Sequence, residues 1–138
     1  MNRYDLSIDD WAMNDLGIIG QVYALKRNTI SLVMNGKESD HHLCQVLPIP
    51  LTEEILVKNG FGYAYNEVSK MQNKQLLVAN IGGHYIEVRL DKKNVAIWYD
   101  YDENGDGVYS DVLIDLPHHV HNFQHLLRLC GIEKSIEL

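Results

Sequence analysis

The feature that most restricts the fold is one short segment, PIPLTEEILVKNGF at residues 48–61, which contains both a helix start and a helix stop. Pro48 and Pro50 force an extended approach, and Thr52 can cap the first helical turn. The two glutamates that follow favour the positive end of a helix, whereas Lys58 and the Asn-Gly pair after it are typical of a helix end. The segment therefore predicts a helix of about two turns within residues 51–61.

The part of the chain before this helix is typical of short antiparallel strands. Apolar residues are dense between Gly17 and Met34, and residues 26–28 interrupt them at an expected turn. Asn35-Gly36 predicts a tight turn because both residues tolerate positive φ. We expect a third strand around Leu43 to Leu47. Short strands joined by tight turns favour a curved sheet or a partial barrel.

The segment from 75 to 116 predicts an antiparallel meander. We expect its strands at Gln75–Ile81, His84–Leu90, Val95–Tyr101 and Val108–Leu116. The second strand alternates cleanly, with Ile86, Val88 and Leu90 on one face. A slip of one residue would turn that apolar face to solvent, so the sequence fixes its register.

A second helix is expected from about His118 to Cys130, where Val120, Phe123 and Leu127 fall at helical spacing before a stop at Gly131. We predict an α+β fold in a single domain spanning residues 1–138. It consists of an N-terminal curved antiparallel sheet resembling a small SH3-like barrel, a short helix, an antiparallel β-meander and a C-terminal helix packed on the sheet. The expected ranges are 1–50 (mostly β), 51–61 (helix), 75–116 (meander) and 118–131 (helix).

Composition narrows the class of protein. The 138 residues carry 12 Lys+Arg and 19 Asp+Glu, a net charge of −7, which disfavours binding to duplex nucleic acid because that binding neutralises phosphates. No apolar run approaches the roughly 18 residues that a membrane helix needs, so no membrane partner is expected. The charged N-terminus lacks the apolar core of a secretion signal, so we expect a cytoplasmic protein. Cys44 and Cys130 are expected to be free, buried thiols.

The segment DYDENGDGVYSD, from Asp100 to Asp111, fits the start of a calcium loop in two registers. Neither register ends in the usual glutamate, and the flanking segments are predicted strands instead of the helices of an EF-hand. We favour a solvated hairpin loop. The alternative is a calcium site whose ligands are Asp100, Asp102, Asn104 and Asp106.

Four histidines mark the start of the C-terminal helix: His118, His119, His121 and His125. His121 and His125 have the i, i+4 spacing that lets two imidazoles share a metal ion such as zinc. The glutamate of an HExxH motif is missing, and spacing identifies no further ligand. We favour a polar helix face with one or two half-buried rings, and keep a metal site at His121 and His125 as the alternative.

Other catalytic and binding patterns are weaker. The sequence has no GxSxG elbow, no phosphate-binding GxxxxGK[ST] and no GxGxxG. Cys44 lies close to His41 and His42, but proximity in sequence is poor evidence for a catalytic dyad. Trp98 and the tyrosines that follow it could stack on single-stranded nucleic acid, although a strand with aromatics on both faces is more often packed on both.

Two segments of the chain together resemble a known group of proteins. They are PIPLTEEILVKNGF (Pro48 to Phe61) and HVHNFQHLLRLCG (His119 to Gly131). They resemble small uncharacterised proteins of Bacteroidetes genomes and their phages or mobile elements, which have a PIPLTEEWLLKFGF-like segment, a β-rich stretch and a YVHQLQNLYFALTG-like helix. His121 belongs to the shared helix pattern, whereas His125 stands where that pattern has Asn. The resemblance implies a phage or mobile-element origin and no particular activity.

We therefore expect a non-enzymatic binding or accessory protein, related to phages or mobile elements, with a protein partner and no cofactor. The first alternative is a metal-binding protein or metal-dependent enzyme that uses His121 and His125 with calcium or zinc. The second is a single-stranded nucleic-acid binding protein. The sequence leaves the partner and the oligomeric state open.

Overall fold

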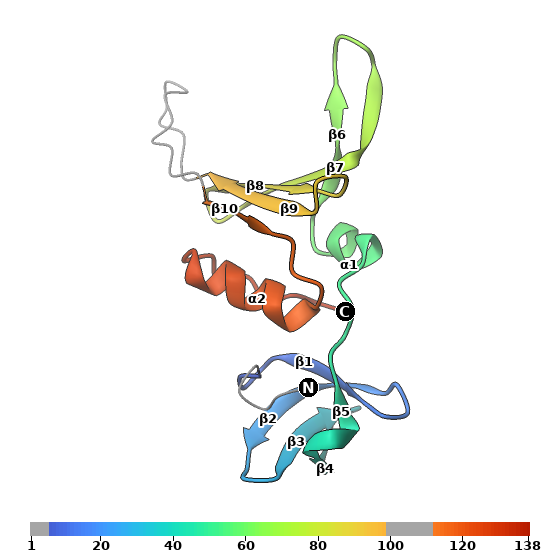
Figure 1. Ribbon diagram of the computed structural model, residues 1–138, viewed down its shortest axis with the longest axis vertical. Helices are drawn as coiled ribbons and strands as arrows, with labels where there is room; N and C mark the ends of the chain where they lie inside the picture. The colour runs from blue at the N-terminus through green and yellow to red at the C-terminus, as the bar shows by residue number, and fades with distance from the viewer. Residues whose placement is uncertain (1–5, 99–111) are drawn as a thin grey trace. The chain divides into compact units, whose positions relative to one another are not determined.

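The computed structural model describes residues 6–98 and 112–138 and shows a mostly-β α+β fold (Figure 1). The chain divides into two compact units. The first runs up to Leu51 and includes His118–Leu126, and the second comprises Thr52–Pro117 and Leu127–Leu138. The predicted α+β class is confirmed.

The first unit is a five-stranded antiparallel half-barrel. Its strands are β1 (Trp11–Asn14), β2 (Ile19–Leu25), β3 (Thr29–Met34), β4 (Lys37–His42) and β5 (Val46–Leu47), in the spatial order β4-β3-β2-β1-β5. The 3₁₀ turn η2 (Leu43–Gln45) lies between β4 and β5, and β5 returns to pair with β1 through Met13↔Leu47. A meander whose last strand returns to its first is the arrangement expected for a curved, SH3-like sheet.

Buried apolar side chains from the strands of this sheet and from the segment before β1 form the core of the first unit. They are Leu6, Ala12, Val22, Ile30, Leu32 and Val46. Gly20 in β2 is required by close packing, because a Cβ at that position would lie 2.9 Å from the Val33 carbonyl oxygen and 2.6 Å from Met34 Cγ. A small half-barrel therefore closes tightly over a small core.

The expected turns of the first unit are confirmed, but one expected strand is wrong in extent. Asn35 and Gly36 both have positive φ, as predicted. The segment Leu43–Leu47 is not a strand throughout, because it begins with η2 and only its last two residues form β5. The strand after the turn is β4, a polar edge strand with no apolar alternation to reveal it.

A hydrogen bond holds this polar edge strand to β3. The Ser31 hydroxyl donates to Asp40 Oδ1 (2.5 Å), and Lys26 Nζ donates to Asp40 Oδ2 (2.9 Å). The Ser31 hydrogen bond and then that of Lys26 lower the pKa of Asp40 below its ordinary value. Asp40 is therefore ionised at neutral pH and serves as an acceptor for both donors.

The second unit contains the meander. Its strands are β6 (Gly62–Asn66), β7 (Met71–Ile81), β8 (His84–Arg89), β9 (Asn94–Trp98) and β10 (Val112–Asp115), in the order β10-β9-β8-β7-β6. Ile86 and Val88 are fully buried, which confirms the predicted face of β8. The expected ends of the third strand (Tyr99–Tyr101) and the start of the fourth (Val108–Asp111) lie outside the described residues.

The two helices begin and end close to where the sequence predicts. Helix α1 (Glu53–Lys58) begins after Thr52, whose hydroxyl accepts the Ile55 N–H, and Gly60 follows it with φ of 95°. Helix α2 (Val120–Leu129) is followed by Gly131 with φ of 74°. Within the first unit, the α2 start is joined to the chain before α1, because Val120 N–H donates to the Ile49 carbonyl.

The C-terminal residues stabilise the end of α1 within the second unit. Asn59, the C-cap of α1, is buried, and its side chain donates to the Glu137 carbonyl and accepts the Glu137 N–H, both at 2.7 Å. Ile132 and Ile136 are also buried. A six-residue helix is too short to be stable alone, so these contacts fix its position.

In the described residues, no helix combines the length and apolar character needed to cross a membrane.

Candidate functional site

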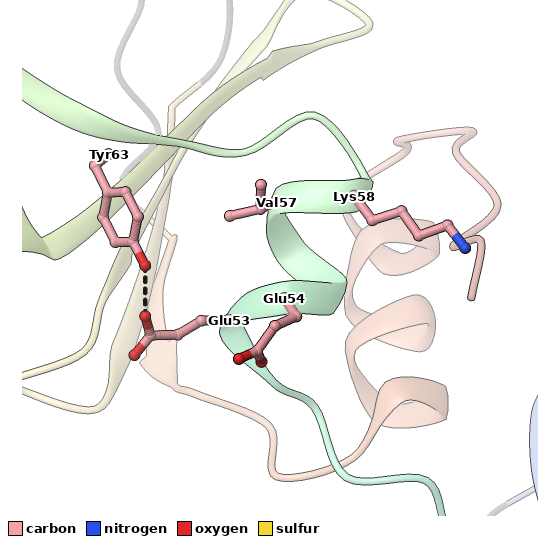
Figure 2. Close-up of a pocket in the computed structure, with 5 residues that line it drawn as sticks. All are labelled: Glu53, Glu54, Val57, Lys58 and Tyr63. Atoms are coloured by element: carbon pink, nitrogen blue, oxygen red, sulfur yellow. Dashed lines mark hydrogen bonds between the residues drawn. The ribbon is translucent and has the colours of Figure 1, made fainter.

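A surface pocket of about 350 Å³ lies between α1 and β6 in the second unit (Figure 2). Its lining residues are Glu53, Glu54, Val57, Lys58 and Tyr63. Two carboxylates, an aromatic ring and an aliphatic side chain thus surround one hollow, a combination that suits a cationic group carrying an alkyl chain.

The helix-start pattern places the two glutamates at the pocket. Thr52 begins α1, so Glu53 and Glu54 occupy its first turn. Val57 lies one turn further along and is 48% exposed. In α1 only Leu56 is buried, and Val57 contributes the apolar wall of the pocket.

Strand β6 supplies the aromatic wall. Tyr63 pairs with Leu77 of β7, whose side chain is fully buried, so the Tyr63 backbone is fixed by the core of the sheet. Its hydroxyl donates to Glu53 Oε2 at 2.5 Å, and Figure 2 shows the two side chains pointing toward each other. The phenol and the carboxylate therefore hold each other in place across the pocket.

This contact changes the titration of the phenol. The hydrogen bond to Glu53, followed by desolvation and the negative charges of Glu53 and Glu54, raises the pKa of Tyr63 above its ordinary value of 10.0. Tyr63 is therefore a neutral hydrogen-bond donor throughout the physiological range.

A register shift lies directly beside the pocket. The pairing changes from Tyr63↔Leu77 to Ala64↔Asn73, which leaves residues 74–76 of β7 without opposite residues on β6. One of them, Lys74, places its ammonium 4.7 Å from the centre of the Tyr63 ring. The ring thus already contacts a cation of its own chain.

Beyond the shift, the β6–β7 hairpin projects from its sheet (Figure 1). We call residues 64–75 the arm. Every residue from 65 to 75 is exposed, including Tyr65 (56%), Val68 (96%) and Met71 (67%). Asn66 organises the tip, since its side-chain oxygen accepts the Val68 and Ser69 N–H groups.

Sequence analysis missed both the pocket and the arm. The sequence predicts only that the two glutamates favour the start of a helix, and it predicts no helix or strand in residues 62–74. The segment Gly62-Tyr-Ala-Tyr-Asn66 has the aromatic residues typical of a strand, and from this signal β6 could have been predicted. No sequence pattern pairs Tyr63 with Glu53, because that contact depends on the turn between α1 and β6.

The histidines of α2 lie in the first unit, and one of them contacts a buried carboxylate. His125 Nε2 lies 2.7 Å from Oδ2 of Asp10, a side chain with no exposed surface that also accepts the Ser7 N–H. The His121 and His125 rings are 5.8 Å apart, edge to face, and His121 is buried. In residues 6–98 and 112–138, no group of three or more His, Cys, Asp or Glu side chains is arranged to hold a metal ion.

The predicted calcium ligands Asp100, Asp102, Asn104 and Asp106 lie outside the described residues, so that site stays a prediction. The pair Asp10 and His125 was not predicted, because 115 residues separate its members.

Two further candidates from the sequence are Cys44 and Trp98. Cys44 differs from our expectation, and the ring of Trp98 is partly covered by other side chains. Cys44 is exposed, not buried, and its sulfur lies 3.1 Å from His42 Nδ1. Both cysteines are free, as predicted. Trp98 is half-buried, with the Tyr85 ring at 5.6 Å and the Arg89 guanidinium at 5.9 Å, so these two side chains already contact its surface.

Comparison with known proteins gives no match: no family model, no curated protein sequence and no solved structure matches this chain.

We predict that Glu53→Gln lowers the pKa of Tyr63 toward 10.0, because it replaces the charged acceptor of the phenol's hydrogen bond, the largest cause of the raised pKa, with a weaker neutral one. A raised folded-state pKa means that the stabilisation by Tyr63 is complete below the unfolded-state value and is lost as pH rises through the folded-state value. NMR titration of the Tyr63 ring, assigned with Tyr63→Phe, measures the shift. An unchanged titration curve in Glu53→Gln would contradict the hydrogen bond.

We also predict that His125→Ala lowers the free energy of unfolding by about 1–3 kcal/mol, because it deprives a buried carboxylate of a hydrogen-bond donor. His125→Gln, whose amide can donate, should recover part of this loss. The exposed His118 provides the control, and His118→Ala should change stability by less than about 0.5 kcal/mol. Urea denaturation measures all three, and equal effects of the two alanine substitutions would refute the assignment.

Proposed function

We propose that this protein is a non-enzymatic binding or accessory protein that holds a lysine or arginine side chain of a partner protein in the α1–β6 pocket. One observation carries the proposal: two carboxylates and a tyrosine ring, contributed by two separate elements, surround the same hollow.

Each wall of the pocket matches one part of a basic side chain. Ionised Glu53 and Glu54 accept charge-assisted hydrogen bonds from an ammonium or guanidinium group. The Tyr63 ring attracts the same cation through its π face, and Val57 contacts the alkyl chain. The position of Lys74 near Tyr63 supports the proposal, since it is the same type of contact within the chain.

The charge balance of the pocket is negative. Lys58 lines one side, but in Figure 2 its ammonium points away from Tyr63 and the two carboxylates. The Glu53 carboxylate keeps an oxygen free of the Tyr63 bond, since only Oε2 accepts it. A cation entering the pocket therefore meets two negative charges, and at the Tyr63 ring it competes with Lys74, whose ammonium lies 4.7 Å from the ring centre.

The exposed arm beside the pocket adds contact area. An isolated two-stranded hairpin is marginally stable in water, and the arm exposes apolar side chains at its tip. Contact with a partner would cover these side chains. As part of the same proposal, and on the resemblance to phage and mobile-element proteins alone, we propose that the binding role is that of an accessory protein of such an element.

We expect the full chain to bind a fluorescently labelled nona-lysine peptide. The double substitution Glu53→Gln/Glu54→Gln should weaken this binding about five- to tenfold, because it removes two charged acceptors. Fluorescence anisotropy at fixed, moderate salt measures the affinity.

Because the whole chain is acidic, the control must change net charge equally. Asp15→Asn/Glu133→Gln alters two exposed acids outside the pocket and should leave the affinity within about twofold of the original. If both double variants weaken binding equally, the lysines are attracted by overall charge and the pocket has no such role.

A further inference from the structure

Strand β6 is an edge strand whose sequence has none of the charges or prolines that usually discourage pairing with another chain. Among the described strands its only neighbour is β7. Edge strands are normally short or carry charges or proline, which discourages pairing with another chain. The other sheet follows this rule, since β4 contains Lys37, Glu38 and Asp40 and β5 has two residues, whereas β6 reads Gly-Tyr-Ala-Tyr-Asn, with neither charge nor proline.

We propose that the β6 edge pairs antiparallel with the β6 edge of a second copy of this chain, and that each copy's arm supplies the lysine that fills the other copy's pocket. This inference rests on the proposed function, because it names the partner of the same pocket. An antiparallel pair of identical five-residue strands overlaps fully when it is centred on the middle residue, Ala64. Tyr63 of each copy then lies opposite Tyr65 of the other.

The centred register makes the interface self-complementary. Aromatic residues directly opposite each other stabilise antiparallel strands, and the two-fold axis provides this Tyr63–Tyr65 contact twice. Beyond Asn66, the tip of one arm continues along the residues that precede Gly62 in the other copy, which are those that lead back to α1. The tip is thereby brought to the pocket.

The distribution of charge favours pairing of a second copy at the β6 edge of the arm over pairing at its β7 edge. The arm has two lysines and one glutamate, hence a net charge of +1, whereas the chain as a whole has −7. At its tip, exposed Lys70 suits the pocket of Glu53 and Glu54. The opposite edge borders a hollow of about 170 Å³ whose charged lining residues are Arg89, Asp91 and Lys92, so its charge is +1, against −1 for the α1–β6 pocket with Glu53, Glu54 and Lys58.

Cysteine cross-linking tests the register. In a Cys44→Ser background, which removes the exposed native thiol, Ala64→Cys should form a disulfide-linked dimer under mild oxidation, because opposite residues of paired strands lie within disulfide reach. The matched control is Asn73→Cys, which faces Ala64 across the arm on β7. Cross-linking at 73 in place of 64, or at neither position, would overturn the β6–β6 interface.

A charge exchange tests the lysine contact. Sedimentation equilibrium of the unmodified chain should give a dimer, and Lys70→Glu or Glu54→Lys alone should raise its dissociation constant about tenfold, since two-fold symmetry removes each ion pair twice. The double variant Lys70→Glu/Glu54→Lys should restore most of the affinity. Lys37→Glu, in the first unit, should leave it unchanged. A double variant as weak as the sum of the singles would overturn the contact.

Failure of this inference can be told apart from failure of the proposed function. If the chain is a monomer that still binds nona-lysine through Glu53 and Glu54, the partner is not a second copy of the chain, but the pocket still binds a cation as proposed. Because Lys70 of the second copy would occupy the pocket in a dimer, the peptide is also tested on Lys70→Glu, whose pocket is empty. If nona-lysine binding to Lys70→Glu shows no dependence on Glu53 and Glu54, the lysine contact is overturned in both proposals.

Discussion

The register shift between Tyr63 and Ala64 is the constraint on which the functional surface depends. Before the shift, β6 belongs to a sheet whose buried residues fix its backbone, as the pairing of Tyr63 with Leu77 shows. After it, the hairpin leaves the sheet and every residue from 65 to 75 is exposed. The same irregularity therefore produces a rigid ring at the pocket and a free arm beside it.

The opposite wall of the pocket is rigid for a different reason. Helix α1 has only six residues and depends on its ends, which are fixed by the Thr52 cap and by two hydrogen bonds between Asn59 and Glu137. Glu53 and Glu54 are thus held by a helix that is joined to the C-terminal residues of its own unit. A pocket with two independently fixed walls binds a side chain without first paying for the ordering of a loop.

The sequence predicted the elements that bury an apolar face and missed those that do not. Thr52 marked a helix start because its hydroxyl accepts an unpaired N–H, and Gly60 and Gly131 marked helix ends because they adopt positive φ. Alternation in β8 predicted its buried face, because burial of one face of a strand imposes a period of two. Strand β4 has polar residues and no buried side chain, and the arm is exposed, so neither period appears in their residues. The pair of Asp10 with His125 and that of Tyr63 with Glu53 join segments whose proximity only the fold creates, and no spacing rule reports them.

The most direct test of the central claim is amide hydrogen exchange of β6 measured over a range of protein concentrations. In a single chain, the amides of β6 that point away from β7 face solvent and exchange quickly. Our account predicts that in residues 62–66 these outward amides become protected as concentration rises, while the amides of β4, the charged edge, do not change. Fast exchange of the outward β6 amides at every concentration would contradict it.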